Sequence, residues 1–213
     1  MAQMADKWIL LDAMGVIFEE GDDVNRLLIP FIREHSPSAD EGQIDDLYME
    51  ASAGHITAPA FWEELGLGDQ YPEIEARYLS RSFRLDHGFR TNAQKLLHQY
   101  SLAMISNDVA EWSAYLREYF DLDRYFRAII VSGEVGHRKP DPAIFKDFLE
   151  RTQADARNCV LVDDRARNLH AAAELGFRTI LFMRPDSEVS FKPDAVVCSF
   201  DELPDAVEWV FHQ

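Results

Sequence analysis

The residues best suited to chemistry stand directly after apolar runs of the chain. The polar residues that close three such runs are Asp12, then Ser106 with Asn107, then Asp163 with Asp164. Burying a lone carboxylate inside an apolar sheet would cost several kcal/mol, so we expect Asp12 at the end of its strand. Carboxylates from two strands suit a hard cation, of which Mg²⁺ is the common one where phosphate is handled. The Ser106 hydroxyl and the Asn107 amide can hold phosphate oxygens beside such a cation.

A compact positive charge is available from Lys139, which lies in the loop-forming run Gly136–Pro142. Taken singly, these residues also have ordinary structural uses. Asp12 can end a strand in a turn, Ser106 can cap a helix and Lys139 can be a solvated loop residue. Their occurrence in order at the ends of predicted strands favours one shared site.

The elements that would position these residues alternate between helices and short apolar strands from residue 90 onward. After a first strand at 8–11, strands are predicted at 101–105, 126–131, 158–162, 179–182 and 195–197. Helices between successive strands call for a parallel sheet that is covered on both faces. We therefore predict a doubly wound, Rossmann-like α/β core, in which the ends of the strands line one edge.

Residues 19–90 have helical periodicity and no convincing strand. Four helices are predicted there, at 24–33 (shortened or kinked by Pro30), 40–53 (with Asp40 as its cap), from Thr57 onward, and 72–83. This block follows the first strand directly. The predicted organisation is a core of residues 1–18 and 91–213 with a small helical domain, 19–90, inserted into it.

The composition narrows the range of partners. With 21 basic and 38 acidic residues the formal net charge is −17, which argues against nucleic acid or an anionic membrane surface as a partner. No apolar run reaches the length of a membrane span, and the N-terminal segment does not resemble a signal peptide. Cys159 and Cys198 lie in or beside predicted strands, so we expect buried, reduced thiols and a cytoplasmic protein. The sequence sets no oligomeric state.

At this point the residues resemble the haloacid dehalogenase-like (HAD) hydrolase superfamily, whose members are mostly Mg²⁺-dependent phosphatases. Asp12, Ser106, Lys139 in its Lys-Pro-Asp-Pro setting, and Asp163-Asp164 match the family's four motifs in order. The resemblance implies that the inserted helices are a cap that selects a small phosphorylated metabolite.

The resemblance also implies a role for each residue of the motifs. Asp12 would attack phosphorus, and Ser106, Asn107 and Lys139 would bind and orient the phosphoryl group. Mg²⁺ would be held by Asp12, the backbone carbonyl of Met14 and Asp164, with Asp163 in support behind them.

Met14 departs from the family pattern, because most of these phosphatases have an aspartate there that serves as acid and base. Asp22, Asp23 or His55 of the cap are candidates to replace it. The departure also admits a 2-haloacid dehalogenase, which uses its aspartate on carbon without metal, although the doubled Asp163-Asp164 and Phe145 argue against that. A third hypothesis is a non-catalytic or regulatory protein that keeps the fold.

Overall fold

The computed structural model describes residues 7–185 and 191–213. Its centre is a six-stranded sheet in the order β3-β2-β1-β4-β5-β6, with every neighbouring pair parallel. The strands are β1 (Trp8–Leu11), β2 (Ser101–Ser106), β3 (Ala128–Val131), β4 (Cys159–Asp163), β5 (Arg178–Phe182) and β6 (Ala195–Val197). The chain winds outward from β1 in both directions, so the predicted doubly wound α/β fold is confirmed.

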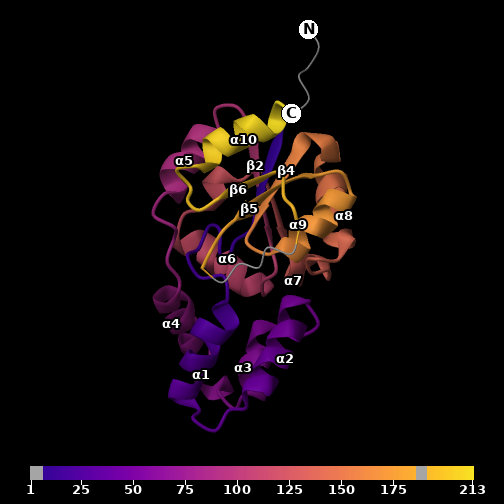
Figure 1. The fold of residues 1–213 in the computed structure, drawn as a ribbon. Coiled ribbons are helices and arrows are strands. Elements are labelled where there is room, and N and C mark those ends of the chain that lie inside the picture. Colours follow the sequence, from indigo (N-terminus) through magenta and orange to yellow (C-terminus); the bar gives the residue numbers. More distant parts are fainter. Residues whose placement is uncertain (1–6, 186–190) are drawn as a thin grey trace.

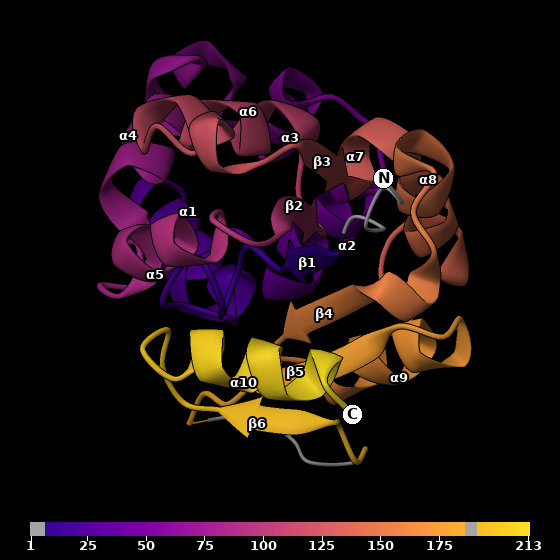
Figure 2. The same cartoon turned by 90° about the horizontal axis from the view of Figure 1, so that it is seen from above.

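The apolar runs form these strands because both faces of the sheet are covered. Ile9 and Leu11 of β1 pack into one hydrophobic cluster, while Trp8 and Leu10 pack into the other. Figure 2 shows the helices on the two sides of the sheet. The helices of the core are α5 (Phe89–Leu96), α6 (Ala110–Tyr119), α7 (Ser132–Val135), α8 (Pro142–Thr152), α9 (Ala166–Glu174) and α10 (Leu203–Phe211). Burial on both faces explains why the strands are continuously apolar rather than alternating.

A separate group of helices extends beyond the edge of the sheet where the strands end, and is called the helical segment below (Figure 1). It consists of α1 (Ile29–His35), α2 (Glu41–Ser52), α3 (Ala58–Glu64) and α4 (Glu73–Ser82). Two of the predicted caps are present, since Asp40 accepts from the Gln43 N–H and Thr57 from the Ala60 N–H. A π-helical turn, Val24–Leu28, runs into α1 just before Pro30. The division into domains at residues 18 and 90 stays a prediction.

The helical segment is joined to the core by two chain crossings that lie side by side. The Glu19 N–H donates to the Arg84 carbonyl at 3.0 Å, and the Asp86 N–H donates to the Ile17 carbonyl at 2.9 Å. Arg184 fastens both crossings to the core, because its guanidinium donates to the Gly15 carbonyl at 2.7 Å and to the buried Asp86 carboxylate at 2.9 Å. The turn that follows β1 is therefore tied to the path by which the chain returns.

Aromatic packing also crosses between the helical segment and α6. The Trp112 ring of α6 lies 5.3 Å from that of Phe61 and 5.4 Å from that of Tyr78, measured between centroids. Glu75 of α4 accepts the indole N–H of Trp112 at 2.7 Å and that of Trp62 at 2.8 Å. One hydrophobic cluster thus continues from the sheet through α6 into α1–α4.

The expectation that both thiols are buried is wrong for one of them. Cys159 is buried within β4, but Cys198 is exposed. Cys198 comes directly after β6, which ends the strand order on that side, so no further strand covers it.

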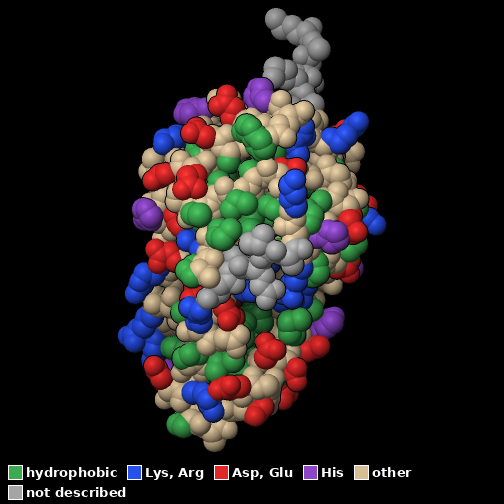
Figure 3. Space-filling model, in the orientation of Figure 1, with side chains coloured by type: hydrophobic (Ala, Val, Ile, Leu, Met, Phe, Trp, Pro, Cys, Tyr) green, Lys and Arg blue, Asp and Glu red, His purple; other side chains and the backbone are tan. Residues whose placement is uncertain are grey.

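Among the described residues no helix is both long and apolar enough to cross a bilayer. Figure 3 shows acidic side chains gathered near the end of the molecule where α2 and α3 lie.

Candidate active site

Three adjacent strands bring the predicted site residues together at one edge of the sheet. Asp12 directly follows β1, Ser106 ends β2, and Asp163 ends β4. Because β1 pairs with both β2 and β4 in parallel, these three positions lie side by side although they are far apart in sequence. Lys139 comes from the loop between α7 and α8. The sequence-based expectation of convergence at this edge therefore agrees with the structure.

Lys139 is the centre of the arrangement. Its ammonium lies 2.8 Å from Asp12 Oδ1 and 2.8 Å from Asp163 Oδ2, and it donates to the Ile105 carbonyl at 2.9 Å. The three donors of the ammonium are thus fully used, and its side chain is 1% exposed. Burial alone would lower the pKa of Lys139, but Asp12 and Asp163 outweigh it and leave the pKa raised. The lysine is a fixed positive charge.

The carboxylates of the site form a tight group. Asp12, Asp163 and Asp164 are buried and offer ligand oxygens that all lie within 4.8 Å of one another. Burial raises the pKa of the Asp12 carboxyl, Lys139 opposes the rise, and Asp163 and Asp164 add to it. Burial likewise raises the pKa of Asp164 to about 7, with Asp163 as the next cause. The group thus concentrates more negative than positive charge in a buried place.

This group fits a hard divalent cation. Three carboxylates, the Lys139 ammonium and the Arg165 guanidinium, which lies 3.4 Å from Asp164 Oδ2, sum to a formal charge of −1, which a cation such as Mg²⁺ would offset. The backbone also makes room for the Asp164 carboxylate, because a Cβ at either Gly15 or Gly21 would overlap its Oδ2. Asp163 is engaged differently: its Oδ1 accepts from the Arg165 N–H at 2.8 Å and from the Asn168 amide at 3.0 Å. Asp12 and Asp164 line the site cavity, whereas Asp163 does not, so these two are the carboxylates that could hold a cation there.

The two polar residues that end β2 differ in what they offer. Ser106 Oγ is buried and has no hydrogen-bond partner among the described residues, so it is available to a ligand. Asn107 is engaged at both ends, since its amide donates to the Lys139 carbonyl at 2.9 Å and accepts from the Lys139 N–H at 2.7 Å. Asn107 also lines the site cavity. Its contacts favour a role in holding Lys139, and phosphate binding by Asn107 stays a prediction.

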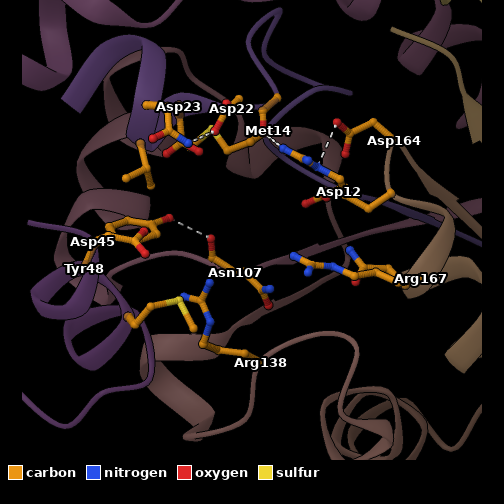
Figure 4. A pocket seen from close by; sticks show the side chains of 16 residues that line it. Asp12, Met14, Asp22, Asp23, Asp45, Tyr48, Asn107, Arg138, Asp164 and Arg167 are labelled. Atoms are coloured by element: carbon orange, nitrogen blue, oxygen red, sulfur yellow. Dashed lines mark hydrogen bonds and ion pairs between the residues drawn. The ribbon is translucent and has the colours of Figure 1, made fainter. Parts of the chain in front are cut away.

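A cavity of about 220 Å³ opens above Asp12 and Asp164 and is walled on its far side by the helical segment (Figure 4). Met14 lies in its wall, together with Asp22 and Asp23, but His55 does not. His55 is exposed and lies 2.9 Å from Glu50, while its neighbour Gly54 packs against the backbone of Gly133. Of the three candidates to replace the missing acid, only the two aspartates reach the cavity.

Sequence reasoning did not find several residues that line the cavity. They are Asp45, Tyr48 and Met49 of α2, Arg138, Arg165 and Arg167. Tyr48 donates its hydroxyl to the Asn107 carbonyl at 3.3 Å, and Arg138 bonds to the Ser52 hydroxyl and lies over the Tyr48 ring. Arg138 directly precedes Lys139, which was a usable signal. For α2 there was none, because its position follows from packing between distant parts of the chain.

Comparison with known proteins settles the family. A family model described as haloacid dehalogenase-like hydrolase matches residues 7–176. The chain belongs to the haloacid dehalogenase-like hydrolases. Its HAD relatives include the D-ribitol-5-phosphate phosphatase of Bacteroides thetaiotaomicron, which is 24% identical over 90% of this chain and 97% of its own length.

Other relatives are longer than this HAD chain. Drimenol cyclase drtB of Aspergillus calidoustus is 30% identical over 66% of the chain, but the match spans only 28% of the cyclase. Glyceraldehyde 3-phosphate phosphatase of Pyrococcus abyssi is 34% identical over 39% of the chain and 35% of its own length.

Solved HAD structures share the fold. A Bacteroides thetaiotaomicron HAD enzyme in complex with magnesium and inorganic phosphate has a TM-score of 0.71 at 23% identity, covering 87% of this chain and 98% of its own. A 2-haloacid dehalogenase from Pseudomonas syringae has a TM-score of 0.68 at 19% identity, covering 96% and 99%. The fold is therefore shared by a 2-haloacid dehalogenase and by an enzyme that binds magnesium and phosphate, so the residues of the site have to distinguish the two reactions.

Proposed function

We propose that this HAD protein is a Mg²⁺-dependent hydrolase of a small phosphate ester and works through an aspartyl-phosphate on Asp12. The observation that carries the proposal is a buried group of charges. Lys139 contacts both Asp12 and Asp163, and ligand oxygens of Asp12, Asp163 and Asp164 lie within 4.8 Å of one another. A carboxylate nucleophile fixed beside an ammonium suits attack on a phosphoryl group, where catalysis is mostly positioning and charge neutralisation.

Each residue has a distinct role in the proposed reaction. Asp12 attacks phosphorus in line with the leaving oxygen. Lys139 neutralises the phosphoryl oxygens, and the free Ser106 hydroxyl donates to one of them. Asp163 holds the Lys139 ammonium in place. Mg²⁺, bound by Asp12, the Met14 carbonyl and Asp164, would supply further positive charge to the phosphoryl group.

The helical segment supplies the rest of the proposed enzyme. It walls the cavity opposite Asp12, so we assign it the cap's task of enclosing a small phosphorylated metabolite and selecting its leaving group. This assignment corresponds to a cap of residues 19–90 on a core of 1–18 and 91–213. Support for a small phosphorylated substrate comes from the phosphatases among the relatives. A metabolite of this kind fits the expected cytoplasmic location.

The dehalogenase alternative rests on Met14 and finds no other support in the site. Phe145, which stands where the dehalogenases have a tyrosine, is fully buried in the core behind the sheet. A metal-free reaction on carbon would also leave the excess negative charge of the three carboxylates uncompensated. The non-catalytic alternative likewise gives no reason to gather three buried carboxylates and a lysine, an arrangement that costs stability.

The test is phosphate release from p-nitrophenyl phosphate by wild type and Asp12→Asn, with and without Mg²⁺. We expect turnover by wild type with Mg²⁺ and a loss of at least about 10³-fold in Asp12→Asn, because the nucleophile is removed. Asp141→Asn is the matched control, since Asp141 is an exposed residue that caps α8. If wild type shows no Mg²⁺-dependent phosphate release, the proposal is refuted. Halide release from a 2-haloacid would then support the dehalogenase alternative.

A further inference from the structure

The proposed function leaves one chemical need unmet beside Asp12. An alkyl or phenyl ester releases a poor leaving oxygen, which a positioned acid normally protonates at a gain of about 10²–10⁴ in rate. Met14, two residues after the nucleophile, lies in the cavity wall with a thioether that neither donates nor accepts a proton usefully. Another group of the same wall has to meet this need if such esters are substrates.

The backbone that follows Met14 forms a loop in which Glu20 and Gly21 come back beside Gly15. The Gly15 N–H donates to the Glu20 carbonyl at 2.9 Å, and a Cβ on Gly21 would lie 3.3 Å from the Gly15 Cα. Arg165 secures the return by donating to the Gly21 carbonyl at 2.5 Å. The next residues, Asp22 and Asp23, therefore stand on the cavity wall that also holds Met14 (Figure 4).

Asp23 is more buried than Asp22 and Asp45, the other two carboxylates of the cavity to which the proposed function gives no role. Asp23 is 8% exposed, whereas Asp45 is exposed and Asp22 is partly exposed and accepts from the Asn25 amide. Asp23 starts the π-helical turn but makes no capping hydrogen bond with its side chain. Burial raises the pKa of Asp23 to about 7, its own backbone N–H opposes the rise, and Asp22 adds to it. Asp23 thus holds a proton near neutral pH and can give it up.

We infer that Asp23 is the general acid and base of the reaction, acting from the wall where Met14 stands. In the first half, an Asp12 oxygen bonds to phosphorus as the bond to the ester oxygen breaks. The Asp23 proton passes to that oxygen, which leaves as the alcohol. In the second half, the Asp23 carboxylate takes a proton from water while the water oxygen attacks phosphorus and the bond to Asp12 breaks. Asp12 and protonated Asp23 are restored. The inference rests on the proposed phosphatase function.

Two esters of similar shape test it. Phenol, like the tyrosine side chain, has a pKa of about 10 and leaves better when protonated, while nitrophenol leaves readily as the anion. With Mg²⁺ present, we expect Asp23→Asn to slow the single-turnover release of phenol from phenyl phosphate by about 10²-fold or more and the release of nitrophenol by less than about threefold. Alcohol release is the quantity to compare, because the second half of the reaction is the same for both esters. Asp45→Asn, which replaces another carboxyl group of the same cavity, should leave the ratio of the two rates unchanged.

The outcomes separate this inference from the function on which it rests. Equal slowing of phenol and nitrophenol release in a single turnover of Asp23→Asn, or no slowing of either, overturns the role of Asp23 while the phosphatase stands. Failure of wild type to hydrolyse either ester with Mg²⁺ overturns the proposed function, and the inference falls with it. Retention of the wild-type ratio of the two rates in Asp23→Glu, which keeps a carboxyl group, supports the role.

A measurement on wild type covers the case in which Asp23→Asn does not fold. In a single turnover, phenol release should decrease above about pH 7 as Asp23 loses its proton, and nitrophenol release should not. Asp23 also interacts electrostatically with other titratable or charged groups around it, namely Asp22, Arg165, Arg138, Tyr48, Tyr78 and Asp108. These groups act on both esters alike, so identical pH profiles for the two would overturn the inference.

Discussion

At the scale of single residues, the site is a buried group of charges that do not cancel. Lys139 lies 2.8 Å from both Asp12 and Asp163, and Arg165 lies 3.4 Å from Asp164, so three carboxylates face two cationic groups. Removing one partner from a buried ion pair usually destabilises a protein more than the pair ever stabilised it, because a charge is left without compensation. The lysine therefore has a structural role in addition to the catalytic role proposed for it.

Replacing Lys139 by methionine tests this balance without measuring activity. We expect Lys139→Met to lower the free energy of unfolding by about 3–5 kcal/mol, since three buried carboxylates then face one another. Added Mg²⁺ should raise the unfolding temperature of the variant more than that of wild type. Thermal unfolding with and without Mg²⁺ is the measurement. Lys146→Met, at an exposed position of α8, is the control. An equal response of all three proteins to Mg²⁺ would contradict a cation site among these carboxylates.

At the scale of elements, α4 is attached to α6 through a buried carboxylate. Glu75 accepts from the indoles of Trp62 and Trp112 with the same oxygen. Burial raises the pKa of Glu75, the two indole N–H groups oppose the rise, and Glu111 adds to it. The folded protein consequently binds this proton more tightly than the unfolded chain does. Its contribution to stability is complete at acid pH and is lost as the pH rises through the folded-state pKa.

Glu75→Gln removes the titration while keeping an oxygen that accepts from both indoles. We expect the unfolding temperature of wild type to fall relative to that of the variant as the pH rises above the ordinary pKa of glutamate. Glu73→Gln, at an exposed position of the same helix, controls for the loss of one charge. Thermal unfolding from pH 4 to pH 8 checks the expectation. A difference between wild type and Glu75→Gln that does not change with pH would contradict it.

The same scale shows what the sequence can and cannot predict. Asp12, Ser106 and Asp163 were predicted to converge because each follows an apolar strand, and parallel strands end at one edge whatever the details of packing. The caps Asp40 and Thr57 were predictable because a cap is local. Tyr48 and Arg138 were not, because their contacts depend on how α2 docks on the core. Asp23 was one candidate among several in the sequence, and its burial in the cavity wall, which depends on the folded structure, set it apart.

At the scale of the whole molecule, the helical segment and the core share one apolar interior. The cluster that includes Ile9 and Leu11 of the sheet also includes Phe61, Trp62 and Tyr78 of the helical segment. Trp112 of α6 belongs to the same cluster, packs against Phe61 and Tyr78, and is 1% exposed. Parts that share a core unfold together rather than separately.

We therefore expect a single cooperative thermal transition, with a calorimetric enthalpy equal to the van't Hoff enthalpy. Trp112→Ala should lower the free energy of unfolding by about 3–5 kcal/mol and weaken this coupling. Trp209→Ala, whose side chain is 53% exposed, should change it by less than about 1 kcal/mol. Scanning calorimetry of the three proteins is the measurement. Two separate transitions in wild type would show that the interior is not shared.

The paired chain crossings have a consequence for evolution. Because Glu19 and Arg84 are hydrogen-bonded neighbours, everything between them leaves and re-enters the core through one point. A recombination event at that point can exchange the whole intervening stretch without shifting the register of β1 against its neighbours. An exchanged segment would need an apolar face that packs against Trp112 and a carboxylate that accepts its indole N–H. Inheritance of the chemistry and inheritance of the substrate can thus follow separate histories within one gene.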